Sequence, residues 1–215
     1  MTNETPFNPR FDDLPTQLPV FPLDGVLLLP RGQLPLNIFE PRYLAMVNDA
    51  LCRDRMIGMV QTTGAGPEIF KTGCAGRITQ FEETSDGRYL ITLTGVCRFE
   101  IAEELEHQRG YRRVRPDWSG FAGDLEKTGC LGLDRSHLTD LLKDYFTLNE
   151  LSMDWGLIDA IGDDSLLTAL AMICPLSAPE KQALLEAPSC KARATLFMNL
   201  LEIAVRAKGC CGSAH

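Results

Sequence analysis

The chain has 215 residues, 45% of them hydrophobic, and its 21 basic and 29 acidic side chains give a net charge of −8. A chain of this length and composition is long enough for one domain, or two small ones, with a substantial core. An acidic protein repels polyanions at long range, which disfavours nonspecific binding to nucleic acid and to anionic membranes.

Targeting and membrane signals are not apparent in the sequence. The start, MTNETPFNPRFDD, lacks the basic region and the apolar core of a secretory signal. The longest nearly apolar run, residues 166–176, is broken by Thr168 and Pro175 and is too short to span a bilayer. The eight cysteines are scattered without regular spacing, so we interpret them as reduced thiols and expect a cytoplasmic protein.

The first expected elements lie in a proline-rich apolar stretch. Residues 1–16 are polar and are expected to form a disordered tail. Residues 18–44, LPVFPLDGVLLLPRGQLPLNIFEPRYL, mix apolar runs with prolines and glycines, which predicts two or three short strands and tight turns. Within them, Leu27–Leu29 is interpreted as a buried strand. A helix is predicted over residues 41–53, because Pro41 suits the first helical position and apolar residues recur on one face after it.

Short strands are predicted after this helix. Asp86-Gly87 is a strong signal for a two-residue hairpin turn. Apolar runs and alternating patterns predict strands over residues 55–61, 74–83, 88–96, 97–105 and 111–115. Since no strand–helix unit repeats, we expect a small β barrel or sandwich over residues 17–118 rather than a parallel sheet.

The second part of the chain is predicted to be helical. Residues 119–133 are glycine-rich and form the predicted linker, and residues 134–208 are predicted to be a bundle of helices, followed by a frayed tail over 209–215. The side chains expected to cap these helices are Asp134 or Ser136, Asp163 or Asp164, Ser177 with Glu180, and Ser189. Strands followed by helices predict an α+β fold.

Three segments carry a resemblance to a known family. LPVFPL, LPLNIFEPRY and GRITQFEETSDGRYLITLTGVCRFEI resemble the amino-terminal domain of Lon proteases, and the resemblance covers about residues 18–205. It implies a PUA-like β pseudo-barrel with one inserted helix, followed by a helical bundle. It also implies a role in recognising and holding substrate proteins. In Lon itself this domain precedes an ATPase module and a serine–lysine peptidase module.

The catalytic parts of Lon have no counterpart in this sequence. A Walker loop requires a Gly-Lys pair, which the chain does not contain, and no lysine lies in a segment typical of the peptidase dyad. No Cys-x-x-Cys pair predicts a zinc site, so we expect no metal and no cofactor. We therefore predict a stand-alone, non-catalytic protein that binds unfolded or partner polypeptides and acts as an adaptor or modulator of a separate ATP-dependent protease.

The predicted protein-binding residues are Arg31, Phe39, Arg42 and Tyr43, because aromatic and cationic side chains favour binding patches. In the alternative interpretation, Phe39 and Tyr43 close the barrel and Arg42 pairs with Glu40 or another nearby carboxylate. No membrane partner is expected.

A second possible function is RNA binding by a PUA-like module. Arginines interleaved with aromatic residues can hold a nucleic-acid strand, and the residues that would do so are Arg109, Tyr111, Arg112, Arg113 and Arg115, with Trp118 nearby. The acidic character of the chain and the neighbouring glutamates favour a solvated ion-pair face instead.

Overall fold

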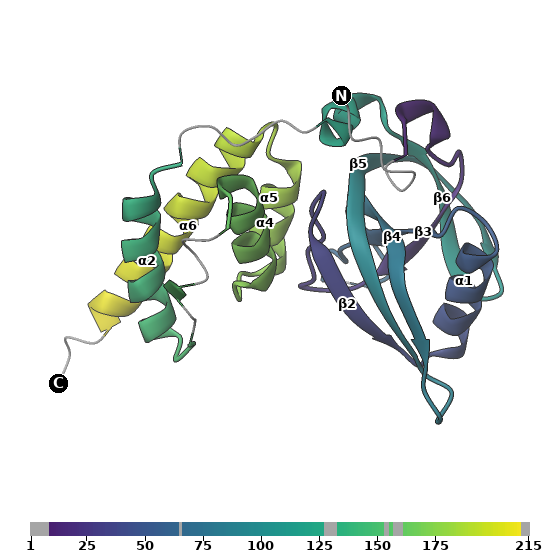
Figure 1. Cartoon of the computed structure of the whole chain (residues 1–215), viewed down its shortest axis with the longest axis horizontal. Helices are drawn as coiled ribbons and strands as arrows, with labels where there is room; N and C mark the ends of the chain where they lie inside the picture. Colours follow the sequence, from purple (N-terminus) through teal and green to yellow (C-terminus); the bar gives the residue numbers. More distant parts are fainter. Residues whose placement is uncertain (1–8, 65, 127–132, 153–154, 157–160, 212–215) are drawn as a thin grey trace.

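A computed structural model describes residues 9–64, 66–126, 133–152, 155–156 and 161–211 (Figure 1). Its β strands form a closed ring with one further strand attached. The ring contains β1 (Leu18–Pro22), β3 (Met56–Val60), β4 (Thr72–Glu83), β5 (Tyr89–Gln108) and β6 (Tyr111–Asp117), and the attached strand is β2 (Gln33–Ile38). β1 runs parallel to β3, every other pair is antiparallel, and the β5–β6 pairing closes the ring.

Strand β5 pairs with three other strands, β2, β4 and β6. Residues 89–94 pair with β2, and the later residues 100–108 pair with β6. The predicted strands 88–96 and 97–105 are therefore one continuous strand. At Gly95 the chain before β2 approaches β5 so closely that a Cβ atom would lie 2.0 Å from the carbonyl oxygen of Leu29. Glycine is required at that position because only a residue without a side chain leaves room for this crossing.

The helix after β2 is the one that the sequence predicts. Helix α1 spans Pro41–Leu51, with proline in its first turn, and buries Met46 and Val47 against the barrel. The prediction of a strand over Leu27–Leu29 is wrong, although all three side chains are buried. They supply apolar contacts from an irregular segment that joins no β ladder.

The helical part contains α2 (Arg135–Leu148), α4 (Asp163–Ile173), α5 (Ala178–Glu186) and α6 (Cys190–Cys211), which lie together beside the barrel in Figure 1. The caps at Asp134, Ser177 and Ser189 form as predicted. The cap of α4 is Gly162, so the prediction of Asp163 or Asp164 as its cap is wrong. These two acids lie in the first turn, where their charge stabilises the helix dipole.

Two hydrophobic clusters form the core of the described part of the chain. The larger cluster joins barrel residues such as Leu28 and Leu93 to helical residues such as Leu170 and Leu184. The smaller one surrounds Phe99 in the barrel and includes Trp118, whose ring lies 5.6 Å from that of Phe99. The α+β fold class is confirmed, whereas the predicted domain limits fall partly outside the described residues and stay predictions.

Four described cysteines carry free thiols: Cys52, Cys74, Cys97 and Cys174. Cys190 is disulfide-bonded, so the expectation that every cysteine is reduced is wrong for this residue. Spacing along the sequence could not reveal this, because it does not say which sulfur atoms meet in the fold. Within the described residues, no helix combines the length and the apolarity needed to cross a membrane.

Candidate polypeptide-binding surface

The turn from β2 to α1 brings together three of the predicted binding residues, Phe39, Arg42 and Tyr43. Pro41 starts the helix, which places Phe39 just outside it with 64% of its surface exposed. The guanidinium of Arg42 forms an ion pair with Glu40, with Nη2 and Oε2 2.8 Å apart. The turn therefore presents an exposed aromatic ring beside the Arg42–Glu40 ion pair.

Tyr43 connects this turn to the buried core. Its ring is buried and lies 4.3 Å from the ring of Phe21 in β1, while the Arg42 guanidinium lies 4.6 Å from the Tyr43 ring centre. Burial raises the pKa of the Tyr43 phenol, and this effect exceeds the opposing effect of the Arg42 charge. The alternative interpretation thus describes Tyr43 and Arg42 correctly, whereas Phe39 does not close the barrel.

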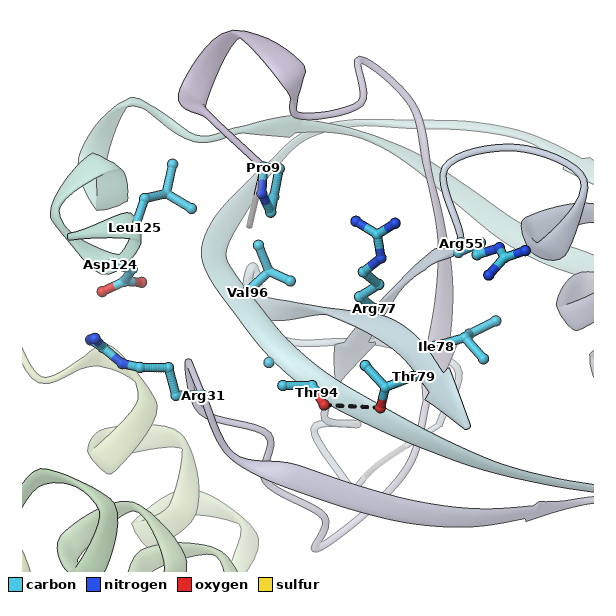
Figure 2. Close-up of a pocket in the computed structure, with 11 residues that line it drawn as sticks. Pro9, Arg31, Arg55, Arg77, Ile78, Thr79, Thr94, Val96, Asp124 and Leu125 are labelled. Atoms are coloured by element: carbon cyan, nitrogen blue, oxygen red, sulfur yellow. Dashed lines mark hydrogen bonds between the residues drawn. The ribbon is translucent and has the colours of Figure 1, made fainter. Parts of the chain in front are cut away.

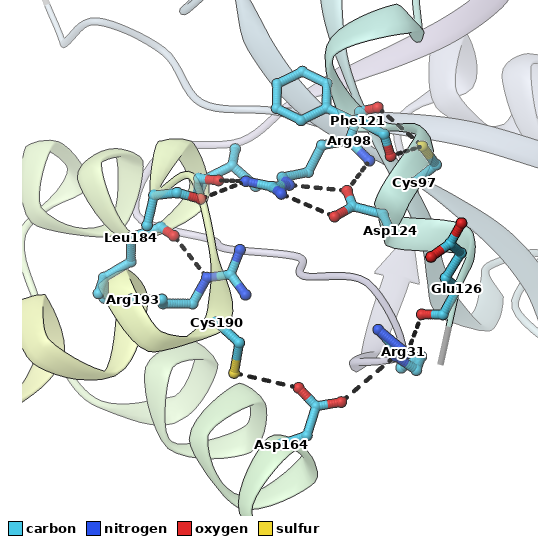
Figure 3. A network of polar contacts seen from close by, with 12 residues as sticks. Arg31, Cys97, Arg98, Phe121, Asp124, Glu126, Asp164, Leu184, Cys190 and Arg193 are labelled. Atoms are coloured by element: carbon cyan, nitrogen blue, oxygen red, sulfur yellow. Dashed lines mark hydrogen bonds and ion pairs between the residues drawn. The ribbon is translucent and has the colours of Figure 1, made fainter. Parts of the chain in front are cut away.

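Arg31 lies away from these three residues. It precedes β2 and Phe39 follows it, so a strand of roughly 20 Å separates them. Arg31 Nη1 donates to the carbonyl oxygen of Glu126 at 3.1 Å, and its Nε lies 3.7 Å from Asp164 on α4. It borders the cavity drawn in Figure 2 and the polar network drawn in Figure 3. Its surroundings are the junction between barrel and helices.

Further apolar side chains lie at the same end of the sheet as Phe39. A shallow hollow over β2, β5 and β4 contains Phe81 and Leu90, which are 43% and 40% exposed. The Phe81 ring lies 5.0 Å from that of Tyr89, the residue that pairs with Ile38 just before Phe39. Our sequence analysis did not select these residues. The sequence feature that could have indicated them is Leu90, an apolar residue on a strand face that otherwise carries Arg88 and threonines.

The arginines of the proposed RNA-binding strand already have partners. Arg109 pairs with Asp49 at 2.8 Å, Arg112 donates twice to Glu104 at 2.6 and 2.8 Å, and Arg115 pairs with Glu103. Arg113 donates to the backbone oxygen of Glu106 and to Gln17. Hydrogen bonding to Arg112 lowers the pKa of Glu104. These contacts form an ion-pair face.

The aromatic residues next to these arginines are buried. The Tyr111 hydroxyl donates to Asp49 at 2.8 Å, and burial together with this hydrogen bond raises its pKa to about 12. Trp118 is only 8% exposed and donates through its indole nitrogen to the backbone oxygen of Pro15. Neither ring offers an open face for a base to stack on. The RNA alternative stays a prediction that the structure does not favour.

Arg98 joins the barrel to the helices and was missed by the sequence analysis. From β5 it donates to the Asp124 carboxylate at 2.9 and 2.8 Å and to the carbonyl oxygens of Leu185 and Ala187 at 2.9 and 2.7 Å (Figure 3). Its side chain is 7% exposed, and that of Asp124 is 11% exposed. The sequence feature that could have indicated this role is the position of Arg98 inside an otherwise apolar strand segment, Val96–Phe99.

A second buried arginine lies next to this pair. Arg193 on α6 donates to the Leu184 carbonyl oxygen at 2.8 Å, and burial, with repulsion from Arg98, lowers its pKa to about 10. Among the described residues, no three or more His, Cys, Asp or Glu side chains gather closely enough to hold a metal ion. Arg98 thus joins the barrel to the end of α5, and Arg193 joins α6 to α5.

Two solved structures share this fold. A Lon N-terminal domain protein from Xanthomonas campestris superposes with a TM-score of 0.59 at 24% sequence identity, covering 87% of this chain and 98% of that one. The N-terminal domain of the Mycobacterium avium complex Lon protease gives a TM-score of 0.57 at 15% identity, covering 88% and 98%. The class of fold is therefore that of Lon N-terminal domains.

Residues 17–202 match the family model of the ATP-dependent protease La (LON) substrate-binding domain. The chain belongs to this family, because the match covers most of it. Lon protease 2 of Myxococcus xanthus is 28% identical over 201 residues, and the Lon protease of Flavobacterium johnsoniae is 24% identical over 205. These alignments cover 88% and 89% of this chain but 24% of each relative. The chain thus spans about a quarter of their length and corresponds to a substrate-recognition module.

Proposed function

We propose that this protein binds segments of unfolded or partner polypeptides without acting on them chemically, through a surface centred on Phe39 and Arg42 and supported by Tyr43. Membership of a substrate-binding family supports polypeptides as the ligand class. The observation that carries the choice of surface is the Phe39 ring, which is 64% exposed although it follows the buried Ile38. Aromatic and arginine side chains contribute most of the binding energy at many interfaces.

We propose further that the protein acts in the cytoplasm as an adaptor or modulator of a separate ATP-dependent protease. The part of Lon that it matches is the substrate-binding domain alone, over residues 17–202. A protein of this kind would deliver polypeptides to a protease or compete with it for them. This role requires that a bound client or a protease be recovered together with the chain.

The surface is tested by measuring the affinity for a permanently unfolded, carboxymethylated protein. We expect Phe39→Ala to weaken binding at least about fivefold, because loss of an interface anchor typically costs more than 1 kcal/mol. Ile203→Ala is the matched control, since Ile203 is similarly exposed, at 62%, but lies on α6. Equal effects of the two substitutions would contradict this choice of surface.

The adaptor role is tested by a pull-down from a lysate of the source cell, with protein and RNA both analysed at low and moderate salt. We expect unfolded proteins or an ATP-dependent protease in the eluate. RNA that disappears as salt rises, and that Arg112→Ala with Arg113→Ala abolishes, would instead support the RNA alternative. Recovery of neither would contradict the adaptor role.

A further inference from the structure

A cavity of about 240 Å³ lies where the barrel meets the helices, between η2 (Ser119–Leu125), α4 and the amino-terminal end of α6. Its volume is below the ~300–1,000 Å³ that is usual for sites of drug-sized ligands. It therefore suits a small ion better than a nucleotide or a peptide segment. We name it the junction cavity.

Arg193 lines the junction cavity and leaves most of its hydrogen-bond donors unused. The residue is 7% exposed, and its Nε donates to the carbonyl oxygen of Leu184 at 2.8 Å. Neither Nη1 nor Nη2 has a hydrogen-bond partner within the part of the chain that the structure describes. Figure 3 shows these two nitrogens pointing into the space between the Arg98–Asp124 pair and Asp164. Because buried charged groups are normally paired, this guanidinium lacks an anion.

The two carboxylates that line the junction cavity already pair with other arginines. Both oxygens of Asp124 accept hydrogen bonds from Arg98, at 2.9 and 2.8 Å, and Asp164 lies 3.7 Å from Nε of Arg31. Arg193 is the third arginine of the described lining, which leaves one positive charge in excess. Burial and the charge of Arg98 lower the pKa of Arg193 to about 10, so the two carboxylates do not fully compensate its charge.

Two further groups at the junction cavity favour an anion. Ser189 and Cys190, where α6 begins, belong to the lining, and the first turn of a helix carries a partial positive charge that attracts anions. Thr168 lines the cavity from α4 and is 7% exposed. Among the described residues its hydroxyl has no hydrogen-bond partner. A charged donor, a hydroxyl and a helix end thus border the same space.

The arrangement of these groups favours a tetrahedral oxyanion. The terminal nitrogens of one guanidinium fit two oxygens of a carboxylate or a phosphate. A carboxylate bound in this way has no oxygen left for the Thr168 hydroxyl or for the start of α6. A phosphate has further oxygens for both, and its volume leaves room for it in a cavity of about 240 Å³.

We propose that the junction cavity binds a free phosphate ion, held by the Arg193 guanidinium, the Thr168 hydroxyl and the amino-terminal turn of α6. The ion lies near Arg98 of β5 and reduces the repulsion between the arginines of the barrel and of the helices. This site is separate from the surface around Phe39, and the inference goes beyond the proposed function because it does not depend on polypeptide binding.

The first test is a calorimetric titration of the whole chain with inorganic phosphate at constant ionic strength. We expect saturable binding of phosphate and none of chloride. O-phosphoserine should bind at least about fivefold more weakly than phosphate, because the cavity leaves little room for an organic group. Absence of saturable phosphate binding, or equal binding of chloride, would overturn the inference. Tighter binding of O-phosphoserine would overturn the assignment of a free ion.

Arg193→Gln tests the charged donor. It removes the unpaired charge but keeps an amide that can donate to the carbonyl oxygen of Leu184, and we expect at least about tenfold weaker phosphate binding. Arg206→Gln is the matched control on the same helix, because the Arg206 side chain is 78% exposed and pairs with Glu202. Equal phosphate affinities of the two variants would overturn the inference.

Thr168→Val gives a decisive result even if Arg193→Gln does not fold. The hydroxyl that it removes has no partner among the described residues, so the melting temperature without phosphate should not fall. We expect at least about threefold weaker phosphate binding. Thr195→Val is the control, because the Thr195 hydroxyl donates to the Lys191 carbonyl oxygen of its own helix. Unchanged phosphate affinity of Thr168→Val would overturn the inference.

Hydrogen exchange locates the bound ion. A ligand that binds only the folded state slows the opening of the segments that it contacts. We therefore expect phosphate to slow amide exchange in η2 and in the first turn of α6. Protection confined to α1 and the turn before it would overturn the assignment to the junction cavity.

Discussion

Arg98 and Asp124 form a buried ion pair whose two hydrogen bonds, of 2.9 and 2.8 Å, connect β5 to the short helix after β6. The same guanidinium binds two carbonyl oxygens at the end of α5. One side chain on β5 thus forms hydrogen bonds with two other segments. In a low-dielectric environment, an arginine that has lost its carboxylate would remain charged and only partly satisfied.

The first prediction concerns this pair. Asp124→Asn should lower the free energy of unfolding by about 3–5 kcal/mol, because it leaves a buried charge uncompensated. Urea unfolding measures the change. Asp86→Asn is the control, since its partner Arg88 and Asp86 itself are about half exposed, and such a pair contributes little to stability. Similar losses in both variants would contradict the structural role of the buried pair.

The second prediction concerns the crossing at Gly95. Gly95→Ala would place a methyl group 2.0 Å from the backbone oxygen of Leu29, which cannot move away as a flexible side chain could. We expect a loss of at least about 2 kcal/mol of folding free energy, comparable to overpacking in a core. Gly123→Ala, where nothing lies within 4 Å of the added carbon, should be nearly neutral. The melting temperatures of the two variants provide the measurement.

The third prediction concerns pH. The pKa of Glu104 is lowered from 4.5, chiefly by its hydrogen bonds with Arg112, so the carboxylate is stabilised in the folded state. This contribution is present above the ordinary pKa and is lost as the pH falls through the folded-state value. The difference in stability between the wild-type protein and Glu104→Gln should therefore shrink as the pH is lowered from neutral to below the ordinary carboxyl pKa.

Urea unfolding at several pH values measures this difference. Glu106→Gln is the control, because Glu106 contributes its backbone oxygen rather than its carboxylate to Arg113. A stability difference for Glu104→Gln that is constant over the acid range would be evidence against the pair. Since both side chains of the Glu104–Arg112 pair are partly exposed, high salt should reduce the difference as well.

The fourth prediction concerns the thiols. Burial raises the pKa of Cys97 and of Cys174 to about 12, and it raises the pKa of Cys74 as well. Since the thiolate is the reactive form, iodoacetamide should modify exposed Cys52 in the native protein and these three only after unfolding. Peptide mass spectrometry measures the labelling. Rapid native labelling of Cys97 would disagree with its place in the barrel core.

Sequence patterns predicted the parts of the fold that depend on neighbouring residues. Pro41 and the capping box at Ser177 and Glu180 depend on local backbone geometry, and α1 and α5 form where these signals predict them. Gly95 was placed inside a predicted strand, residues 88–96, because nothing in the local pattern reveals that another segment crosses there. The reason lies at Leu29, far away in sequence.

The candidate site was predictable to a similar extent. Phe39 and Arg42 lie in one recognisable motif, and the structure places them together. The prediction that Arg31 lies beside them was wrong. Residue types that are typical of an interface do not show how far apart a strand places them in the fold. The position of Arg31 with Arg55 and Arg77, around the cavity drawn in Figure 2, required the folded barrel.

Strand β1 has a consequence for synthesis of the protein on the ribosome. Its residues Leu18–Pro22 pair with β3 on one side and with β6, residues 111–117, on the other. The growing chain must therefore hold an apolar segment, LPVFP, without its second partner until β6 has left the exit tunnel. Pro19 and Pro22 cannot donate backbone hydrogen bonds, which limits mispairing with other nascent chains during this interval. The prolines that restrict the barrel's first strand thus also protect it before the barrel exists.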